Sequence, residues 1–149
     1  MKFRSLLQAT LIAAFAICYS APAFAGDDPI EGVWYSEDSS AKIKIYLAKN
    51  QKFYGKIIWL KNPNEEDGTP KVDDKNPDKS KRSEPILNML ILKSFEKDGD
   101  KEYEDGTIYD PKSGKTYSCT ITHKGNSLKV RGYIGISLIG RTAIWTKAD

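Results

Sequence analysis

The residues that could support catalysis are few. His123 is the only histidine among the 149 residues. Hydrolytic triads and catalytic zinc sites need a histidine together with several positioned partners. The chain also lacks the sequence motifs of zinc proteases, serine hydrolases, phosphate-binding loops and dinucleotide-binding folds. We therefore predict no catalytic residue and no cofactor, and we expect His123 to have a structural or solvent-facing role.

Two acidic groups suggest other chemistry. Oxygen-bearing side chains recur at every second position over residues 74–80, as ligands do in a calcium-binding loop. However, Lys79 stands where that loop needs glycine, and Pro85 stands where it needs glutamate. Residues 65–67 are adjacent acids, whereas the two carboxylates of a glycosidase face each other across a cleft. We predict no metal site and interpret both groups as parts of a solvated, turn-rich loop.

The elements that must position any site are β-strands. Apolar residues alternate with polar ones in short segments separated by turn residues, which is typical of a sandwich or a barrel. The segments with this pattern are 42–47, 53–60, 103–109, 116–123, 127–134 and 141–147. The apolar run 86–92 fits a strand or a buried helical turn. We predict an all-β fold, a single small antiparallel β-barrel, because closure removes exposed sheet edges.

Residues 61–85 interrupt this pattern between the early and the late strands. The segment is almost entirely polar and contains Asn-Pro and Asp-Gly turn signals followed by several lysines. Loops of this length are uncommon and are usually functional or disordered, and so polar a segment cannot support a core of its own. We expect this long polar loop to lie over a barrel mouth and to control ligand access.

The N-terminus predicts export. Lys2 and Arg4 precede an apolar run over residues 6–17, and Ala23-Phe24-Ala25 is typical of a signal-peptide cleavage site. We therefore predict a signal peptide over residues 1–25. The mature protein would reach the periplasm or the cell exterior and would contain no transmembrane segment after cleavage.

The predicted mature chain, residues 26–149, is long enough for one domain with one core. The full chain has 23 Lys and Arg against 20 Asp and Glu, and cleavage removes two of the basic residues and no acid. The mature protein is therefore nearly neutral, and its charge provides no reason to expect nucleic-acid binding.

Two short features point to a known superfamily. Gly32-Val33-Trp34 opens the first predicted strand, and Arg141 stands on the last one. This arrangement resembles lipocalins and fatty-acid-binding proteins, where an early Trp lies across one barrel end and a late Arg packs over it. A cation on an indole face contributes on the order of 1 kcal/mol. The resemblance implies that Trp34 and Arg141 form a structural pair at one end of the barrel.

A longer set of residues is more specific. The matching segments are 32–34, 105–111, 114–117, 119, 131–135, 140–142 and 145. Together they resemble the bacterial family known as domain of unknown function 2147, short exported proteins with a lipocalin-like barrel of the calycin superfamily. Many members carry a C-x-x-C motif where this chain has Asp73 and Asn76. A redox or thiolate-metal role that depends on this motif in other members is therefore not expected for this chain.

In such a barrel, strand alternation places one set of side chains inside, where a ligand would bind. The candidate ligand-binding residues are Ile45, Phe53, Ile57, Trp59, Tyr117, Ile121 and Val130. An eight-stranded barrel can be fully packed or can hold one small ligand. Apolar walls with a few polar groups, such as the Tyr117 hydroxyl, suit an amphipathic molecule.

The leading hypothesis is an exported lipocalin-like binding protein for a small apolar or amphipathic ligand. The alternative is an interaction module with a solid core that binds another envelope protein through its outer face or its loop. Exposed Tyr46, Tyr54, Arg131 and Tyr133 would support that alternative, because Tyr and Arg are enriched at interfaces. An enzyme is the third hypothesis, and it lacks a credible catalytic set.

Overall fold

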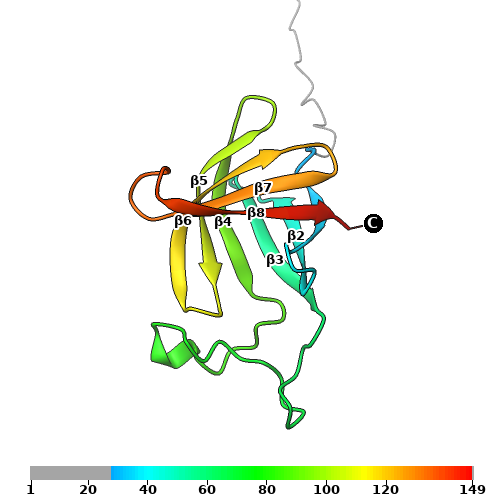
Figure 1. Cartoon of the computed structure of the whole chain (residues 1–149), viewed down its shortest axis with the longest axis vertical. Helices are drawn as coiled ribbons and strands as arrows, with labels where there is room; N and C mark the ends of the chain where they lie inside the picture. The colour runs from blue at the N-terminus through cyan, green and yellow to red at the C-terminus, as the bar shows by residue number, and fades with distance from the viewer. Residues whose placement is uncertain (1–27, 149) are drawn as a thin grey trace, which may run out of the picture.

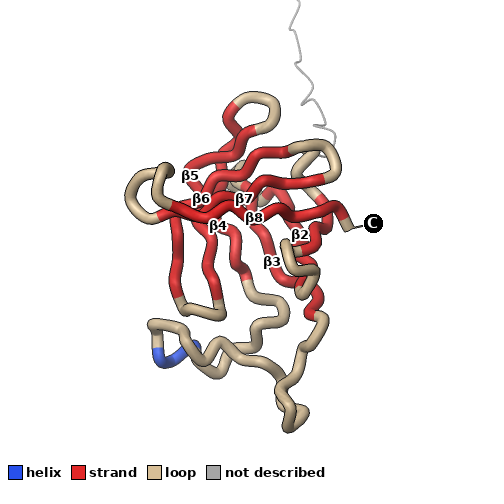
Figure 2. Tube along the Cα trace, in the orientation of Figure 1, coloured by secondary structure: helices blue, strands red, loops and turns tan. Residues whose placement is uncertain are grey.

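The computed structural model describes residues 28–148, so the predicted signal peptide lies outside the described residues. Eight β-strands account for about half of the described residues. They are β1 (Gly32–Tyr35), β2 (Ala41–Leu47), β3 (Phe53–Leu60), β4 (Leu90–Asp98), β5 (Glu102–Asp110), β6 (Lys115–His123), β7 (Ser127–Tyr133) and β8 (Gly140–Lys147). Within residues 28–148 the one helix is a single 3₁₀ turn, η1 (Lys79–Lys81), shown in blue in Figure 2.

The strands form a closed antiparallel barrel in which each strand pairs with its neighbours in sequence. Closure is made by β1 and β8, where Trp34 pairs with Lys147 and Tyr35 with Thr146. Figure 1 shows the strands wrapped around one another, with red β8 crossing the front. The prediction of an all-β, single antiparallel barrel is confirmed, and closure leaves no strand without two neighbours.

One half of the barrel is solid. Trp34, Phe95 and Tyr103 are completely or almost completely buried there, and the Phe53 ring meets the Tyr103 ring edge-on with centroids 5.2 Å apart. Gly106 allows this packing, because a Cβ at that position would lie 2.4 Å from the Phe95 ring. Aromatic rings thus fill the end of the barrel that carries the turns 48–52, 99–101 and 124–126, which we call the closed end.

The opposite end carries the long connection 61–89 and is called the open end. Its other connections are 36–40, 111–114 and 134–139. In Figure 1 the green connection between β3 and β4 extends below the barrel at this end. The apolar run 86–92 splits between that connection and β4, which begins at Leu90.

The long polar loop is held to the barrel by a buried carboxylate. Asp73 is fully buried and accepts hydrogen bonds from the Tyr109 hydroxyl, at 2.7 and 2.9 Å, and from the Asn76 side-chain amide, at 2.7 Å. Its backbone N–H also donates to the Glu84 carbonyl at 2.9 Å. Hydrogen bonds therefore give the loop a defined structure that its low hydrophobicity could not provide.

Trp59 lies outside the barrel, so its predicted interior position is wrong. A β-bulge shifts the register of β2 and β3: Lys42 pairs with Trp59, but Ile43 pairs with Ile57. The extra residue, Ile58, reverses the alternation of facing side chains. The Trp59 side chain is 40% exposed and meets the Tyr35 ring edge-on on the outer surface, with Lys42 Nζ 5.5 Å from its centroid.

Candidate ligand-binding cavity

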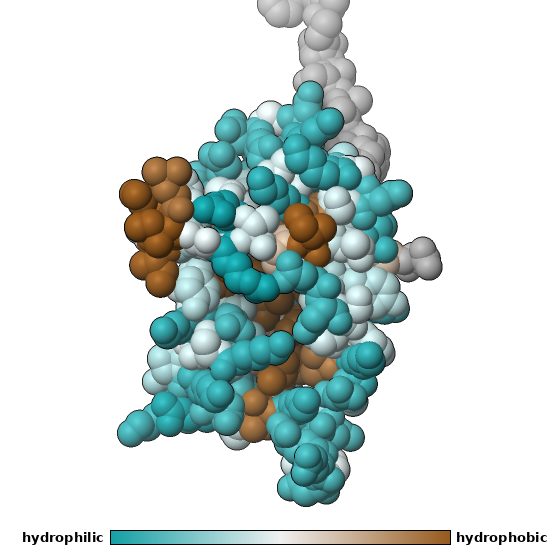
Figure 3. Space-filling view, in the orientation of Figure 1, coloured by the Kyte–Doolittle hydropathy of each residue, from teal (hydrophilic) through white to brown (hydrophobic). Residues whose placement is uncertain are grey.

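A cavity of about 1030 Å³ occupies the open half of the barrel. Its deep wall is apolar and is formed by Ala41, Ile43, Ile57, Ile91, Ile108, Val130, Ala143 and Trp145. Figure 3 shows the hollow as a brown-lined opening in a largely teal surface. Such a wall favours the apolar part of a ligand, because burying that part removes it from water.

Three of the predicted site residues line the cavity: Ile57, Tyr117 and Val130. Ile45, Phe53 and Ile121 are also inside the barrel, but they are buried in the hydrophobic core and do not line the cavity. Strand alternation assigns an inward or outward direction correctly for these six residues. It cannot tell which inward residues face a cavity, since that depends on what fills each layer of the barrel.

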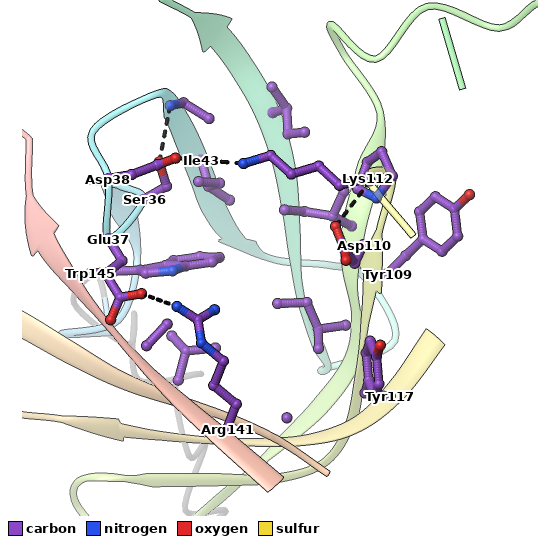
Figure 4. A pocket seen from close by; sticks show the side chains of 18 of the residues that line it. Ser36, Glu37, Asp38, Ile43, Tyr109, Asp110, Lys112, Tyr117, Arg141 and Trp145 are labelled. Carbon is purple, nitrogen blue, oxygen red and sulfur yellow. Dashed lines mark hydrogen bonds and ion pairs between the residues drawn. The ribbon is translucent and has the colours of Figure 1, made fainter. Parts of the chain in front are cut away.

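Several lining residues were missed in the sequence. Ile91 and Ile108 come from β4 and β5, and Ala143 and Trp145 come from β8. Trp145 is only 5% exposed and forms part of the cavity wall close to Arg141 (Figure 4). The signal that could have found the two β8 residues was the spacing of Arg141, Ala143 and Trp145 at every second position of one strand, which puts all three on the same face.

The rim of the cavity is charged. Arg141 forms an ion pair with Glu37 across the junction of β8 and the 36–40 turn, and Lys112 Nζ lies 3.6 Å from Asp38 Oδ2. Figure 4 shows both basic side chains extending toward the acids of that turn. Lys71 of the long polar loop also lines the cavity. The opening therefore combines three cations with nearby carboxylates above an apolar interior.

Asp38 is fixed as an anion on this rim. Its Oδ1 accepts hydrogen bonds from the Ser40 hydroxyl at 2.7 Å, the Ser36 hydroxyl at 2.8 Å and the Ser40 backbone N–H at 3.1 Å. These bonds, with the Ser40 and Ser36 hydroxyls contributing most, hold the pKa of Asp38 well below its usual range. The side chain that Lys112 approaches is thus charged at neutral pH.

Tyr109 joins the barrel wall to the long polar loop. It borders the cavity, but its ring points away from it (Figure 4), and its hydroxyl donates to the buried Asp73 carboxylate of the loop. Burial, and then the hydrogen bond to Asp73, raise the pKa of Tyr109 to about 12, so it is a neutral donor at physiological pH. The hydroxyl of Tyr109 therefore attaches the loop to the outer side of β5.

The cation over Trp34 is Lys147, and the predicted pair of Trp34 with Arg141 is wrong. Lys147 Nζ lies 4.5 Å from the Trp34 ring centroid, and the two residues pair in register between β1 and β8. Arg141 lies six residues earlier on β8, at the open end, where it binds Glu37. The short β1 pairs only with the last residues of β8, which places Arg141 too far from the indole.

His123 lies away from the cavity. Its ring meets the Trp34 ring edge-on with centroids 6.0 Å apart, at the closed end. Burial, together with the nearby charge of Lys147, lowers its pKa. Over residues 28–148 no three His, Cys, Asp or Glu side chains gather in a way that could hold a metal ion.

A closed eight-stranded antiparallel meander with one solid end and an apolar cavity at the other defines a lipocalin-like barrel. The chain belongs to the family described as uncharacterized protein conserved in bacteria (DUF2147), whose model matches residues 32–147. The resemblance inferred from the sequence is thereby confirmed.

The fold is also similar to a solved structure. Protein HP1028 from the human pathogen Helicobacter pylori, described as belonging to the lipocalin family, superimposes with a TM-score of 0.69. The two chains share 22% sequence identity over 80% of this chain and 82% of that one. At this identity the similarity establishes the fold. A comparison with curated protein sequences gave no significant match. Within the described part of the chain, no helix is both long and apolar enough to cross a membrane.

Proposed function

We propose that this protein is an exported carrier that holds one small amphipathic molecule in the barrel cavity. The observation that carries the proposal is the cavity of about 1030 Å³, which is apolar inside and charged at its rim. Binding sites for small molecules typically have volumes of up to about 1000 Å³ and combine apolar walls with a few polar groups. The signal-peptide pattern of residues 1–25 supports export to the periplasm or the cell exterior.

The arrangement of charges suggests how such a ligand would be oriented. Its apolar part would lie against Ile57, Val130 and Trp145, and its polar head would remain among the rim charges. Lys112 and Arg141 already bind carboxylates, with side chains that are 84% and 79% exposed. An anionic head could exchange with those carboxylates, because exposed ion pairs contribute only about 0–1 kcal/mol.

The solid-core alternative is less well supported. It requires a filled barrel, whereas the open half of this barrel is hollow. The tyrosines that suggested it, Tyr46, Tyr54 and Tyr133, are half-buried, and the Tyr46 and Tyr54 rings stack on each other with centroids 6.3 Å apart.

Filling the cavity tests the carrier proposal. Ala143→Trp should place an indole in the cavity and weaken binding of a fluorescent fatty acid by roughly tenfold or more, since a larger side chain removes the volume that the ligand needs. Ile144→Trp is the matched control, because Ile144 is the next residue on β8 and is 46% exposed. Equal affinities for both variants and the parent protein, at unchanged stability, would contradict binding in the cavity.

The ligand itself can be sought by native mass spectrometry of the protein purified from an export-competent host. We expect a discrete additional mass that is released on denaturation and is identified as a lipid or another amphiphile. A bare mass, together with no binding of added fatty acids or lipids, would overturn the carrier proposal.

A further inference from the structure

The connection between β7 and β8 exposes an unusual number of large aliphatic side chains. Ile134, Ile136, Leu138 and Ile139 are 67%, 59%, 85% and 69% exposed. No charged residue occurs between Arg131 and Arg141. Figure 3 shows these residues as a brown cluster projecting at the left edge of the molecule, and Figure 1 shows the same segment as a protruding loop. We call residues 133–140 the apolar loop.

Several backbone groups of the apolar loop form hydrogen bonds with other groups of the protein. Arg131 donates two hydrogen bonds to the Ser137 carbonyl, at 2.8 Å from Nε and 2.5 Å from a terminal nitrogen. The Ile139 N–H donates to the Ile136 carbonyl at 3.1 Å. Internal hydrogen bonds lower the cost of moving a backbone segment from water into an apolar medium, where no water can replace them.

The apolar loop is continuous with the cavity. Tyr133, Ile134, Ile139 and Gly140 all contribute to the cavity lining, next to Arg141 on the rim. The base of the apolar loop is therefore part of the cavity wall, while its tip, with Ile136 and Leu138, projects beyond the cavity into solvent. This continuity distinguishes the loop from the exposed Ile144, which lies on β8 and does not line the cavity.

We propose that the apolar loop inserts into the interface of a lipid bilayer and thereby brings the cavity mouth to the membrane. The side chains of Ile136 and Leu138 would enter the acyl boundary. Arg131 and Arg141, which flank the loop, would remain at the level of anionic head groups, as basic side chains commonly do. Exchange of an amphiphile between bilayer and cavity rests on the proposed carrier function, whereas the docking step does not.

A bilayer fits this surface better than a protein partner does. The loop is convex and has no charged side chain between its flanking arginines, so it offers little to specify a complementary protein pocket. The Ser137 carbonyl is already bound by Arg131, which leaves it little capacity to bind a partner. Aliphatic side chains flanked by cations match the layered polarity of an anionic membrane surface.

Vesicle co-sedimentation tests the docking. The mature protein should bind vesicles of phosphatidylethanolamine and phosphatidylglycerol, and the double variant Ile136→Ser/Leu138→Ser should bind roughly tenfold or more weakly, because two inserted side chains become polar. Ile144→Ser is the matched control and should bind like the parent protein. Equal binding by the double variant and the parent, or no binding by either, would overturn the proposal.

Two further measurements separate the remaining explanations. Hydrogen exchange should slow in peptides covering residues 133–140 when vesicles are added, and should not change in the turn 99–101 at the closed end. Concentration-dependent self-association that the double variant abolishes, without vesicle binding, would show a second copy as the occupant and overturn membrane docking. Binding of a soluble fluorescent fatty acid without vesicles reports the carrier function separately, so the two proposals can fail independently.

Discussion

The hydroxyl of Tyr109 is the residue-scale link between the barrel and the long polar loop. It donates to the fully buried Asp73 carboxylate, so Tyr109→Phe leaves a buried acceptor with one partner fewer. We expect the free energy of unfolding to fall by about 1–3 kcal/mol. Urea denaturation measures the loss, and Tyr54→Phe is the control, because the Tyr54 hydroxyl bonds to Asn50 and Ser94 near the surface. Equal losses for both variants would contradict a special role for the buried bond.

A second prediction concerns the cation over Trp34. A double-mutant cycle with Trp34→Leu and Lys147→Met should give a coupling energy of about 0.5–1 kcal/mol in the free energy of unfolding. The same cycle with Arg141→Met in place of the lysine substitution should give none, because Arg141 binds Glu37 at the other end of the barrel. A measurable coupling energy between Trp34 and Arg141 would contradict this prediction and support the Trp34–Arg141 pair expected from the sequence.

At the scale of elements, the long polar loop is an addition to a barrel that can close without it. β3 and β4 are antiparallel neighbours, so a short turn can join them directly. Replacing residues 63–84 with such a turn removes Lys71 from the cavity mouth and also removes Asp73, which anchors the loop to Tyr109.

We expect this replacement to speed up release of a bound fluorescent fatty acid while the strand signal in circular dichroism is retained. Stopped-flow measurement of the release rate is the direct test. An unchanged rate in a folded variant would exclude control of ligand access by the loop, and a lost strand signal would show that the loop is needed for folding.

For the whole molecule, the titration of carboxylates predicts acid sensitivity. Burial raises the pKa of Asp28, but hydrogen bonds from Lys97 and Tyr103 outweigh it and leave the pKa below the usual 3.8. Hydroxyl and backbone hydrogen bonds lower the pKa of Asp38 in the same direction. A carboxylate whose pKa is lower in the folded state stabilises the fold above its unfolded pKa, and this contribution is lost as pH falls through the folded pKa.

The free energy of unfolding should therefore fall as pH is lowered from about 4 toward about 2. Asp28→Asn should make the protein less stable at neutral pH and should make this decline shallower, since the variant has one carboxylate fewer to protonate. Urea denaturation at a series of pH values provides the measurement. Parallel curves for the variant and the parent would show that Asp28 does not contribute.

The sequence alone determined the fold class, because it depends on local patterns. Strand alternation and turn residues specify short strands, and a chain of short strands avoids exposed edges by closing. The interior positions of Ile57, Tyr117 and Val130 follow from the same alternation, and the family follows from residues distributed along most of the chain.

Only the tertiary structure decided how the barrel is filled and what it exposes. The bulge at Ile58 turns Trp59 outward, and pairing of β1 with the last residues of β8 brings Lys147, instead of Arg141, over Trp34. The aromatic rings fill one end and leave the other hollow, with the apolar loop at its mouth. These features depend on register and on contacts between residues far apart in the chain, which alternation within a single strand does not encode.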